Sequence, residues 1–165
     1  MSHVVNKEPL QADAQIRNIA ALKWAAEHYC GGLVFKEGQH HFRTWKSDHG
    51  GRLVGDWPVP EGYTAEEVGK HCDHAIGLKD ARSGTGSYEI GVVPSRKFPG
   101  TYSLMYDFFG GALEQQAGKG LEKLMQGYQV RMSQMVAQQT GDPVKQYQDG
   151  EDTIIEIDTT VRMGV

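Results

Sequence analysis

Two regular patterns of apolar positions predict helices. Between residues 18 and 29, apolar side chains recur every three or four positions, Asn18 can cap the first turn, and Gly31 and Gly32 can end the helix. A longer pattern begins after Gly110-Gly111 and continues to about Gln139. Its apolar stripe consists of Leu121, Leu124, Tyr128, Met132 and Met135. We expect this stripe to be buried against a sheet.

Short apolar runs bounded by glycine and proline predict strands. A hairpin is expected from residues 33–35 and 40–45, with its turn at Glu37-Gly38. Residues 75–78, 88–93 and 101–108 are expected to form an antiparallel meander, in which residues 83–86 are the tip of the first hairpin. Terminal strands are expected at residues 3–6 and 153–158.

The segment between the hairpin and the meander has a different composition. Residues 47–62 are rich in glycine and proline, which is typical of a surface excursion, and we interpret residues 38–63 as a loop or hairpin insertion. Thr64 and Glu67 then match the capping-box pattern and predict a short helix to about Cys72.

These elements favour one fold class. Because strands joined by short loops outnumber the helices, we expect a single α+β domain over residues 1–165, with an antiparallel sheet of about five strands and two main helices packed on one face. A doubly wound parallel sheet would need a helix between nearly every pair of strands.

Composition and charge narrow the function classes. The apolar fraction is 39% and the charged fraction 23%, as in globular proteins, and the net charge of −4 disfavours nonspecific nucleic-acid binding. No apolar run is long enough to span a bilayer, and the N-terminus lacks the pattern of a secretory signal. Cys30 and Cys72 are the only cysteines, so we expect reduced thiols and a cytoplasmic protein.

The order of several short segments resembles a known family. These segments are residues 1–3, 16–22, 74–77, 88–93, 106–111 and 121–128. Together they resemble the domain-of-unknown-function family numbered twelve fifty-seven, which includes the hypothetical chloroplast reading frame thirty-five protein. The resemblance implies a compact α+β domain without an established set of catalytic residues, and it implies an AAA+ ATPase as partner. It is also compatible with a phage origin.

The densest group of metal-ligand residue types is His71, Cys72 and His74, with Asp73 between them. Imidazole and thiolate suit zinc, and upstream histidines at positions 40, 41 and 49 could approach the group. The spacing lacks a paired-ligand motif, so the favoured interpretation is a polar junction between a helix and a strand, with Cys72 buried. We expect no cofactor, with zinc or another transition metal as the alternative.

Other motifs are weaker. No serine has the context of a nucleophile elbow, and the glycine-rich segments 83–87 and 118–120 lack the order of a phosphate-binding loop. Arg43, Lys46 and Arg52 lie among Phe42, Trp45 and Trp57, a mixture that can bind single-stranded nucleic acid or can simply pack on its own sheet.

Three hypotheses follow. The first is a non-enzymatic interaction module, an accessory partner of a larger assembly such as an AAA+ ATPase, with a protein as its partner. The second is a small metal-dependent enzyme that uses the histidine cluster. The third is a nucleic-acid-binding module, which the acidic net charge disfavours.

Overall fold

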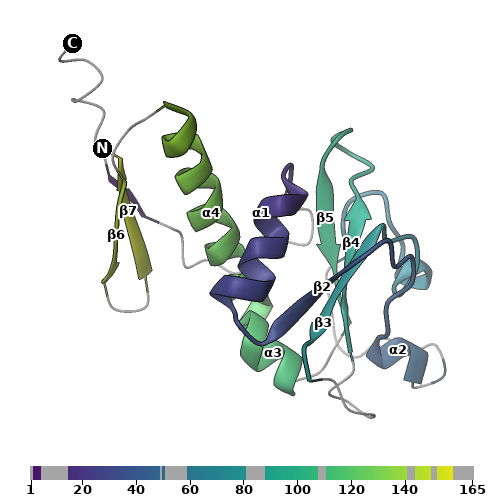
Figure 1. The fold of residues 1–165 in the computed structure, drawn as a ribbon. Coiled ribbons are helices and arrows are strands. Elements are labelled where there is room, and N and C mark those ends of the chain that lie inside the picture. The colour runs from purple at the N-terminus through teal and green to yellow at the C-terminus, as the bar shows by residue number, and fades with distance from the viewer. Residues whose placement is uncertain are drawn as a thin grey trace.

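The computed structural model shows an α+β protein (Figure 1). It describes residues 2–4, 15–48, 50, 59–80, 88–107, 111–140, 144–149 and 152–157. The expected hairpin tip at 83–86 and the residues His49, Arg52 and Trp57 lie outside these ranges, as do residues 5–6 and 158 of the two expected terminal strands.

The centre of the fold is a four-stranded antiparallel sheet. Its strands, in spatial order, are β2 (Leu33–Glu37), β3 (His74–Leu78), β4 (Ile90–Pro94) and β5 (Tyr102–Met105). The meander β3-β4-β5 is therefore confirmed.

The expected hairpin between residues 33–35 and 40–45 is wrong. The whole of β2 pairs with β3, so that Leu33 faces Leu78 and Glu37 faces His74. Residues 40–44 form no strand, although their aromatic and basic residues alternate. The better partner for β2 lies about forty residues further along the chain, and a local pattern cannot reveal a pairing at that distance.

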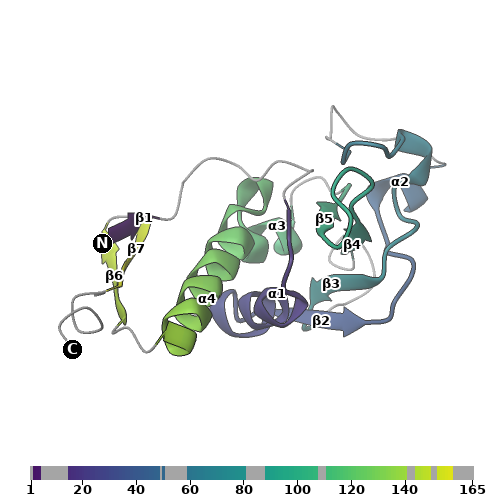
Figure 2. The ribbon, with the colours of Figure 1, turned by 90° about the horizontal axis from the view of Figure 1, so that it is seen from above.

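A second, smaller sheet joins strands from the two ends of the chain. It has three antiparallel strands in the order β1 (Ser2–Val4), β7 (Asp152–Ile157) and β6 (Val144–Asp149). Figures 1 and 2 show it on the far side of the long helix from the central sheet. The expected single sheet of about five strands is therefore replaced by two sheets, and the strand 144–149 was not foreseen.

The first helix matches its prediction. It consists of α1 (Ile19–Trp24) and a π-helical continuation, η1 (Ala25–Tyr29). The side chain of Asn18 caps it by accepting a hydrogen bond of 3.0 Å from the backbone N–H of Ala21.

The expected long helix is broken near its start. Helix α3 (Ala112–Ala117) ends at Gly118, the 3-10 turn η4 (Lys119–Leu121) follows, and α4 (Glu122–Thr140) continues from there. Gly118 and Gly120 have φ angles of 85° and 65°, which lie in the left-handed region that glycine adopts readily. The glycines therefore divide the segment into two helices instead of merely weakening its first turn.

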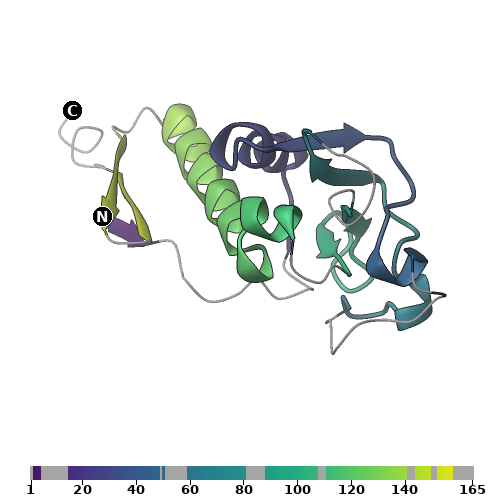
Figure 3. The same cartoon turned by 90° about the horizontal axis from the view of Figure 1, so that it is seen from below.

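Helices α1, α3 and α4 lie on one side of the central sheet (Figures 1 and 3). Helix α3 and η1 contact β2, whereas α4 contacts α1 and η1. Leu121, Leu124 and Tyr128 are buried, and Met132 and Met135 are half-buried against the same core. The stripe is thus buried as expected, but it packs mainly on the first helix, which lies between α4 and the sheet.

The opposite face of the sheet is covered as well. Because side chains alternate along a strand, Ile76, Val92 and Leu104 enter the helical core while Ala75 and Val93 enter a second apolar cluster. The remaining members of this second cluster are Phe42, Tyr63, Val68, Cys72 and Met105. Chain segments between residues 42 and 72 therefore cover the face that the expected two-layer arrangement would leave open.

Candidate functional site

A pocket of about 530 Å³ lies on the outer side of this second cluster. Two chain segments form its walls, residues 41–47 and residues 68–70. Its lining residues are His41, Phe42, Arg43, Lys46, Ser47, Val68, Gly69 and Lys70, a set that we call the basic pocket. Its described lining contains four residues of basic type and no carboxylate.

At the start of the first wall, before helix α2 (Trp45–Asp48), neighbouring residues face opposite sides. Phe42 is 3% exposed and belongs to the second cluster, whereas His41 and Arg43 on either side of it are exposed. The buried carboxylate of Glu89 on the adjoining segment fixes this wall to the sheet. It accepts hydrogen bonds from the backbone N–H of Arg43 at 3.0 Å and from Lys36 Nζ at 2.7 Å.

The two walls are joined directly. The backbone N–H of Phe42 donates to the carbonyl oxygen of Gly69 at 3.0 Å. Gly69 has a φ of 93°, and a Cβ at this position would lie 3.2 Å from the Phe42 carbonyl oxygen. Glycine therefore permits both the left-handed conformation and the close approach of the walls.

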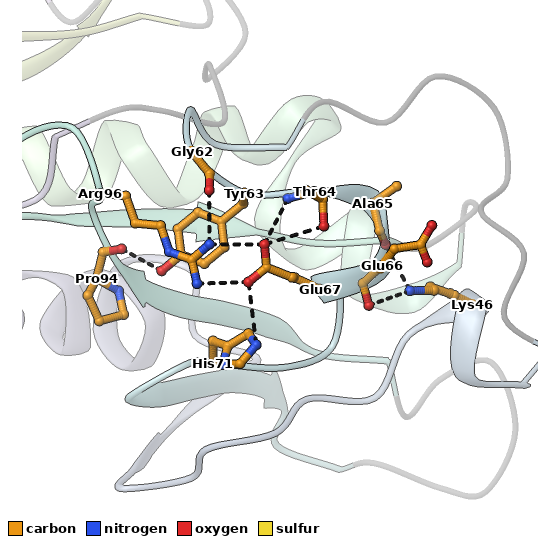
Figure 4. A network of polar contacts seen from close by, with 10 residues as sticks. All are labelled: Lys46, Gly62, Tyr63, Thr64, Ala65, Glu66, Glu67, His71, Pro94 and Arg96. Atoms are coloured by element: carbon orange, nitrogen blue, oxygen red, sulfur yellow. Dashed lines mark hydrogen bonds and ion pairs between the residues drawn. The ribbon is translucent and has the colours of Figure 1, made fainter.

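Lys46 forms a second link between the walls (Figure 4). It lies in the short helix α2 (Trp45–Asp48), and its Nζ donates to the carbonyl oxygens of Ala65 and Glu66 at 2.8 and 2.7 Å. These carbonyls belong to the 3-10 turn η2 (Ala65–Glu67), which precedes the second wall. Hydrogen bonds within the fold therefore join the two walls at both ends of the pocket.

An ion pair fixes the second wall to the central sheet, and we call it the Glu67 clamp (Figure 4). Arg96, just beyond β4, donates to both carboxylate oxygens of Glu67, at 2.9 Å to Oε1 and 2.7 Å to Oε2. Glu67 Oε1 also accepts from the backbone N–H of Thr64 at 3.1 Å, as the predicted capping box requires. The expected helix to Cys72 is nevertheless only one turn long, because Val68 is extended and Gly69 is left-handed.

The clamp gives a pH-dependent prediction. The hydrogen bonds from Arg96, with smaller contributions from Thr64 and His71, lower the pKa of Glu67 from 4.5 to about 2. Since the folded pKa is depressed, the clamp stabilises the fold above about pH 4.5 and loses this effect as the pH falls toward 2. We expect Arg96→Gln to raise the Glu67 pKa toward 4.5, as measured by NMR titration of its carboxyl carbon.

A control variant shows whether the Glu67 pKa depends on Arg96 itself or on any nearby positive charge. Lys97, next to Arg96, pairs instead with Glu61 at 2.7 Å. Lys97→Gln should therefore leave the Glu67 titration near pH 2. An unchanged titration in Arg96→Gln would show that Arg96 does not hold this carboxylate.

The structure does not bring the side chains of His71, Cys72 and His74 to one point. His71, at a φ of 62°, extends toward Glu67, with Nε2 3.4 Å from Oε2. Cys72 enters the second cluster and donates its thiol to the Gln39 carbonyl oxygen at 3.0 Å. His74 lies beside Phe35 with ring centroids 5.2 Å apart, and its Nδ1 accepts from the backbone N–H of Gly38 at 3.1 Å.

The upstream histidines do not complete a metal site within the described ranges. His40 Nδ1 lies 3.0 Å from the Cys72 carbonyl oxygen, and His41 lines the basic pocket. In the part of the chain that the structure describes, no three His, Cys, Asp or Glu side chains converge as metal ligands would. The junction interpretation of residues 71–74 fits the contacts that each side chain makes.

A double substitution tests this interpretation. Replacing His71 and His74 with Gln should lower the free energy of unfolding only by the loss of one polar contact each, about 1 kcal/mol per residue. A chelator should leave the melting temperature of the wild-type chain unchanged. A chelator-induced fall that zinc reverses, and that the double variant lacks, would instead identify a structural metal.

The two cysteines are poor nucleophiles at neutral pH. Both are free and buried, and burial raises the pKa of each thiol to about 11. Among the nucleic-acid candidates, the Phe42 ring is buried in the second cluster and half-buried Trp45 packs on Tyr88, with ring centroids 6.4 Å apart. Arg43 and Lys46 do lie together, in the basic pocket.

Sequence reasoning found Arg43 and Lys46 but missed His41 and Lys70 as their neighbours. The missing information is the backbone contact between Phe42 and Gly69, which places residues 41–47 beside residues 68–70. Two sequence features could have indicated this set of neighbours. Basic residues alternate with Phe42 at positions 41–43, and Gly69 precedes Lys70.

Comparisons with known proteins add no relative. No family model matches the chain, and no curated protein or solved structure matches it. The resemblance to family twelve fifty-seven therefore stays a prediction. None of the described helices combines the length and the apolar character that crossing a membrane requires.

Proposed function

We propose that this chain is a non-enzymatic interaction module, an accessory partner of a larger assembly. The observation that supports the proposal is the basic pocket, which is open to solvent, lined by both apolar and basic residues, and held in shape by the fold itself. Such a preformed concave surface loses little conformational entropy when it binds another molecule. The class of partner suggested by the sequence resemblance is an AAA+ ATPase.

The alternative of a metal-dependent enzyme has less support. Its candidate ligands His71, Cys72 and His74 point to three different partners, namely Glu67, the Gln39 carbonyl and the Gly38 N–H. A metal site there would need all three contacts to break. The free buried thiols also fit a reducing compartment, so the proposal includes a cytoplasmic location.

Native purification tests the proposal. The chain, tagged at its C-terminus and expressed in the cells that encode it, should elute with a protein partner at a fixed molar ratio. That ratio should persist through a second, size-based separation, and quantitative mass spectrometry would measure it. Elution of the chain alone, with turnover of a small substrate, would contradict the proposal.

A further inference from the structure

We infer that the chain forms a twofold-symmetric dimer in which strand β6 pairs antiparallel with the β6 of a second copy. The three-stranded sheets of the two copies would then join into one continuous sheet. This inference goes beyond the proposed function, because the surface that it assigns is separate from the basic pocket. Three observations carry it: the position of β6 in its sheet, the way the other sheet edges are covered, and the order of charges along the strand.

Strand β6 is an edge strand of the smaller sheet. Among the strands that the structure describes, it pairs only with β7, along its whole length. In an antiparallel ladder, alternate residues direct their backbone N–H and C=O groups to opposite neighbours, so every second residue of β6 directs them to the outer edge. Such an edge is a template on which another strand can pair.

The edges of the central sheet are partly occupied by groups of the same chain. At β2, the backbone N–H of Phe35 donates to Glu27 Oε2 at 3.2 Å. At β5, Ile16 and Tyr102 exchange backbone hydrogen bonds of 2.8 and 2.7 Å. Strand β1, at the other edge of the smaller sheet, has only 3 residues. Among the described edge strands, β6 with its 6 residues therefore offers the longest stretch for pairing.

Symmetry limits how two copies of β6 can pair. Residues that direct their backbone groups to the outer edge must face residues that do the same, so one residue of β6 lies opposite its own copy at the twofold axis. An axis at residue 146 pairs positions 144–148, and an axis at residue 147 pairs positions 145–149. Any other axis pairs fewer positions, so the strand length leaves these two registers.

The order of charges selects the register centred on Tyr147. In this register Lys145 faces Asp149 of the second copy, and the twofold axis repeats the pair. In the register centred on residue 146, Lys145 faces Tyr147 of the second copy and Asp149 lies beyond the paired positions. Opposite charges directly across a strand pair stabilise it, whereas like charges destabilise it. The sequence of β6 is therefore complementary to its own copy around Tyr147.

The same register improves the environment of Asp149. Within one chain, Asp149 stands opposite Asp152 of β7, which places like charges across the hairpin. Lys145 of the second copy would offset this repulsion. A lysine on an edge strand can also keep other strands away, because pairing would bury its charge without a partner. Here the register provides a carboxylate opposite each lysine, so that protection does not apply between two copies of this strand.

The proposed interface lies away from the basic pocket. Figures 1 and 2 show the smaller sheet at one end of the molecule and helix α2, which contributes Lys46 and Ser47 to the pocket, at the other. A dimer joined through β6 would therefore carry two accessible basic pockets. Such a dimer could bind a partner that has two matching sites with higher avidity than one chain would.

Charge reversal on either side of the pair tests the inference. Sedimentation equilibrium at a series of concentrations should show a monomer–dimer equilibrium for the wild-type chain. Lys145→Glu and Asp149→Lys each place like charges at both symmetric contacts, so each should weaken dimerisation about tenfold or more. An equimolar mixture of these two variants should dimerise like wild type, because every contact between the two different chains again joins opposite charges.

The mixture also separates the interface from local damage. Lys145→Glu places a carboxylate opposite Glu156 of its own chain and could disturb the hairpin. A second chain cannot repair such damage, whereas it can supply the opposite charge across an interface. Lys119→Glu, at an exposed position in η4, should dimerise like wild type. Thermal melts would establish that each variant is folded.

A disulfide bond tests the register. Tyr147→Cys places a thiol opposite its own copy, at a spacing that a disulfide can span, and should give a covalent dimer under mild oxidation. Val144→Cys is the matched control, since it lies three residues from the axis and about 20 Å from its own copy. The native cysteines are buried and should not compete.

Three results would overturn the inference. They are a wild-type chain that stays monomeric at every concentration, dimerisation that neither charge reversal weakens, and a mixture of the two variants that forms no dimer. Covalent dimers from Val144→Cys but not from Tyr147→Cys would contradict the register centred on Tyr147.

Discussion

Replacing Leu124 with Asp is expected to unfold the domain. Leu124 is fully buried in the main core, where α4 packs on the first helix. The substitution removes a buried aliphatic side chain and places a carboxylate where the core supplies apolar neighbours. Together these effects cost about 4 kcal/mol or more, a large part of the total stability of a typical domain. Near-UV circular dichroism and the loss of a cooperative melt would measure the outcome.

Two further variants make this result interpretable. Leu124→Ala should remain folded but lose about 2–5 kcal/mol, because it removes the same contacts without adding a charge. Lys123→Asp, at the exposed neighbouring position, should melt within about 1 kcal/mol of wild type. A soluble, fully folded Leu124→Asp protein would mean that α4 presents this face to solvent.

Gly91→Ala is expected to destabilise the chain by about 1–3 kcal/mol. Gly91 is buried in β4, and the ring of Phe42 lies over it from the wall of the basic pocket. An added Cβ would lie 2.8 Å from Phe42 Cζ and closer still to two other carbons of the ring. Although Ala is otherwise preferred to Gly within a strand, this gain of about 0.5–1 kcal/mol is smaller than the cost of displacing a buried ring. Urea denaturation would measure the difference.

Gly32 provides the matched control. The three atoms nearest to a Cβ there all belong to the side chain of Gln116, whose flexible end can rotate away. Gly32→Ala should therefore change the free energy of unfolding by no more than about 0.5 kcal/mol. Equal effects at Gly32 and Gly91 would show that the Phe42 ring does not lie on β4. In that case Phe42 could not contribute to the pocket as described.

The elements that depend on residues close together in sequence were predicted correctly. Asn18 caps α1, Thr64 and Glu67 form the capping box, and the glycine-bounded runs form β3, β4 and β5. Each of these depends on residues within a few positions of one another, so periodicity and capping chemistry suffice to find them.

Contacts between segments that are distant in sequence could not be predicted in this way. The partner of β2 is β3, so the expected hairpin arm at residues 40–45 became the first wall of the basic pocket. Similarly, the stripe on α4 signalled burial but could not indicate that α1 lies between that helix and the sheet. Periodicity shows which face of an element is buried, but it does not identify the neighbour that covers it.

The candidate site was predicted only in part for the same reason. His71, Cys72 and His74 were candidates because they are close along the chain, yet their side chains point in different directions. His71 has a left-handed backbone conformation, and His74 begins strand β3, in which successive side chains face opposite sides. Lys70, adjacent to them, joins Arg43 and Lys46 through a contact between Phe42 and Gly69. Proximity along the chain was the poorer guide to which side chains lie together.

Site-specific photo-crosslinking in cells would show directly whether a protein partner binds at the basic pocket. A photoreactive amino acid would be placed at Ser47, an exposed residue of the basic pocket, and in parallel at Lys119, an exposed residue outside it. We expect one protein adduct of constant mass from position 47, absent from position 119 and lost when Lys70→Glu is added. Equal adducts from both positions, or an adduct at position 47 that consists of nucleic acid, would contradict this expectation.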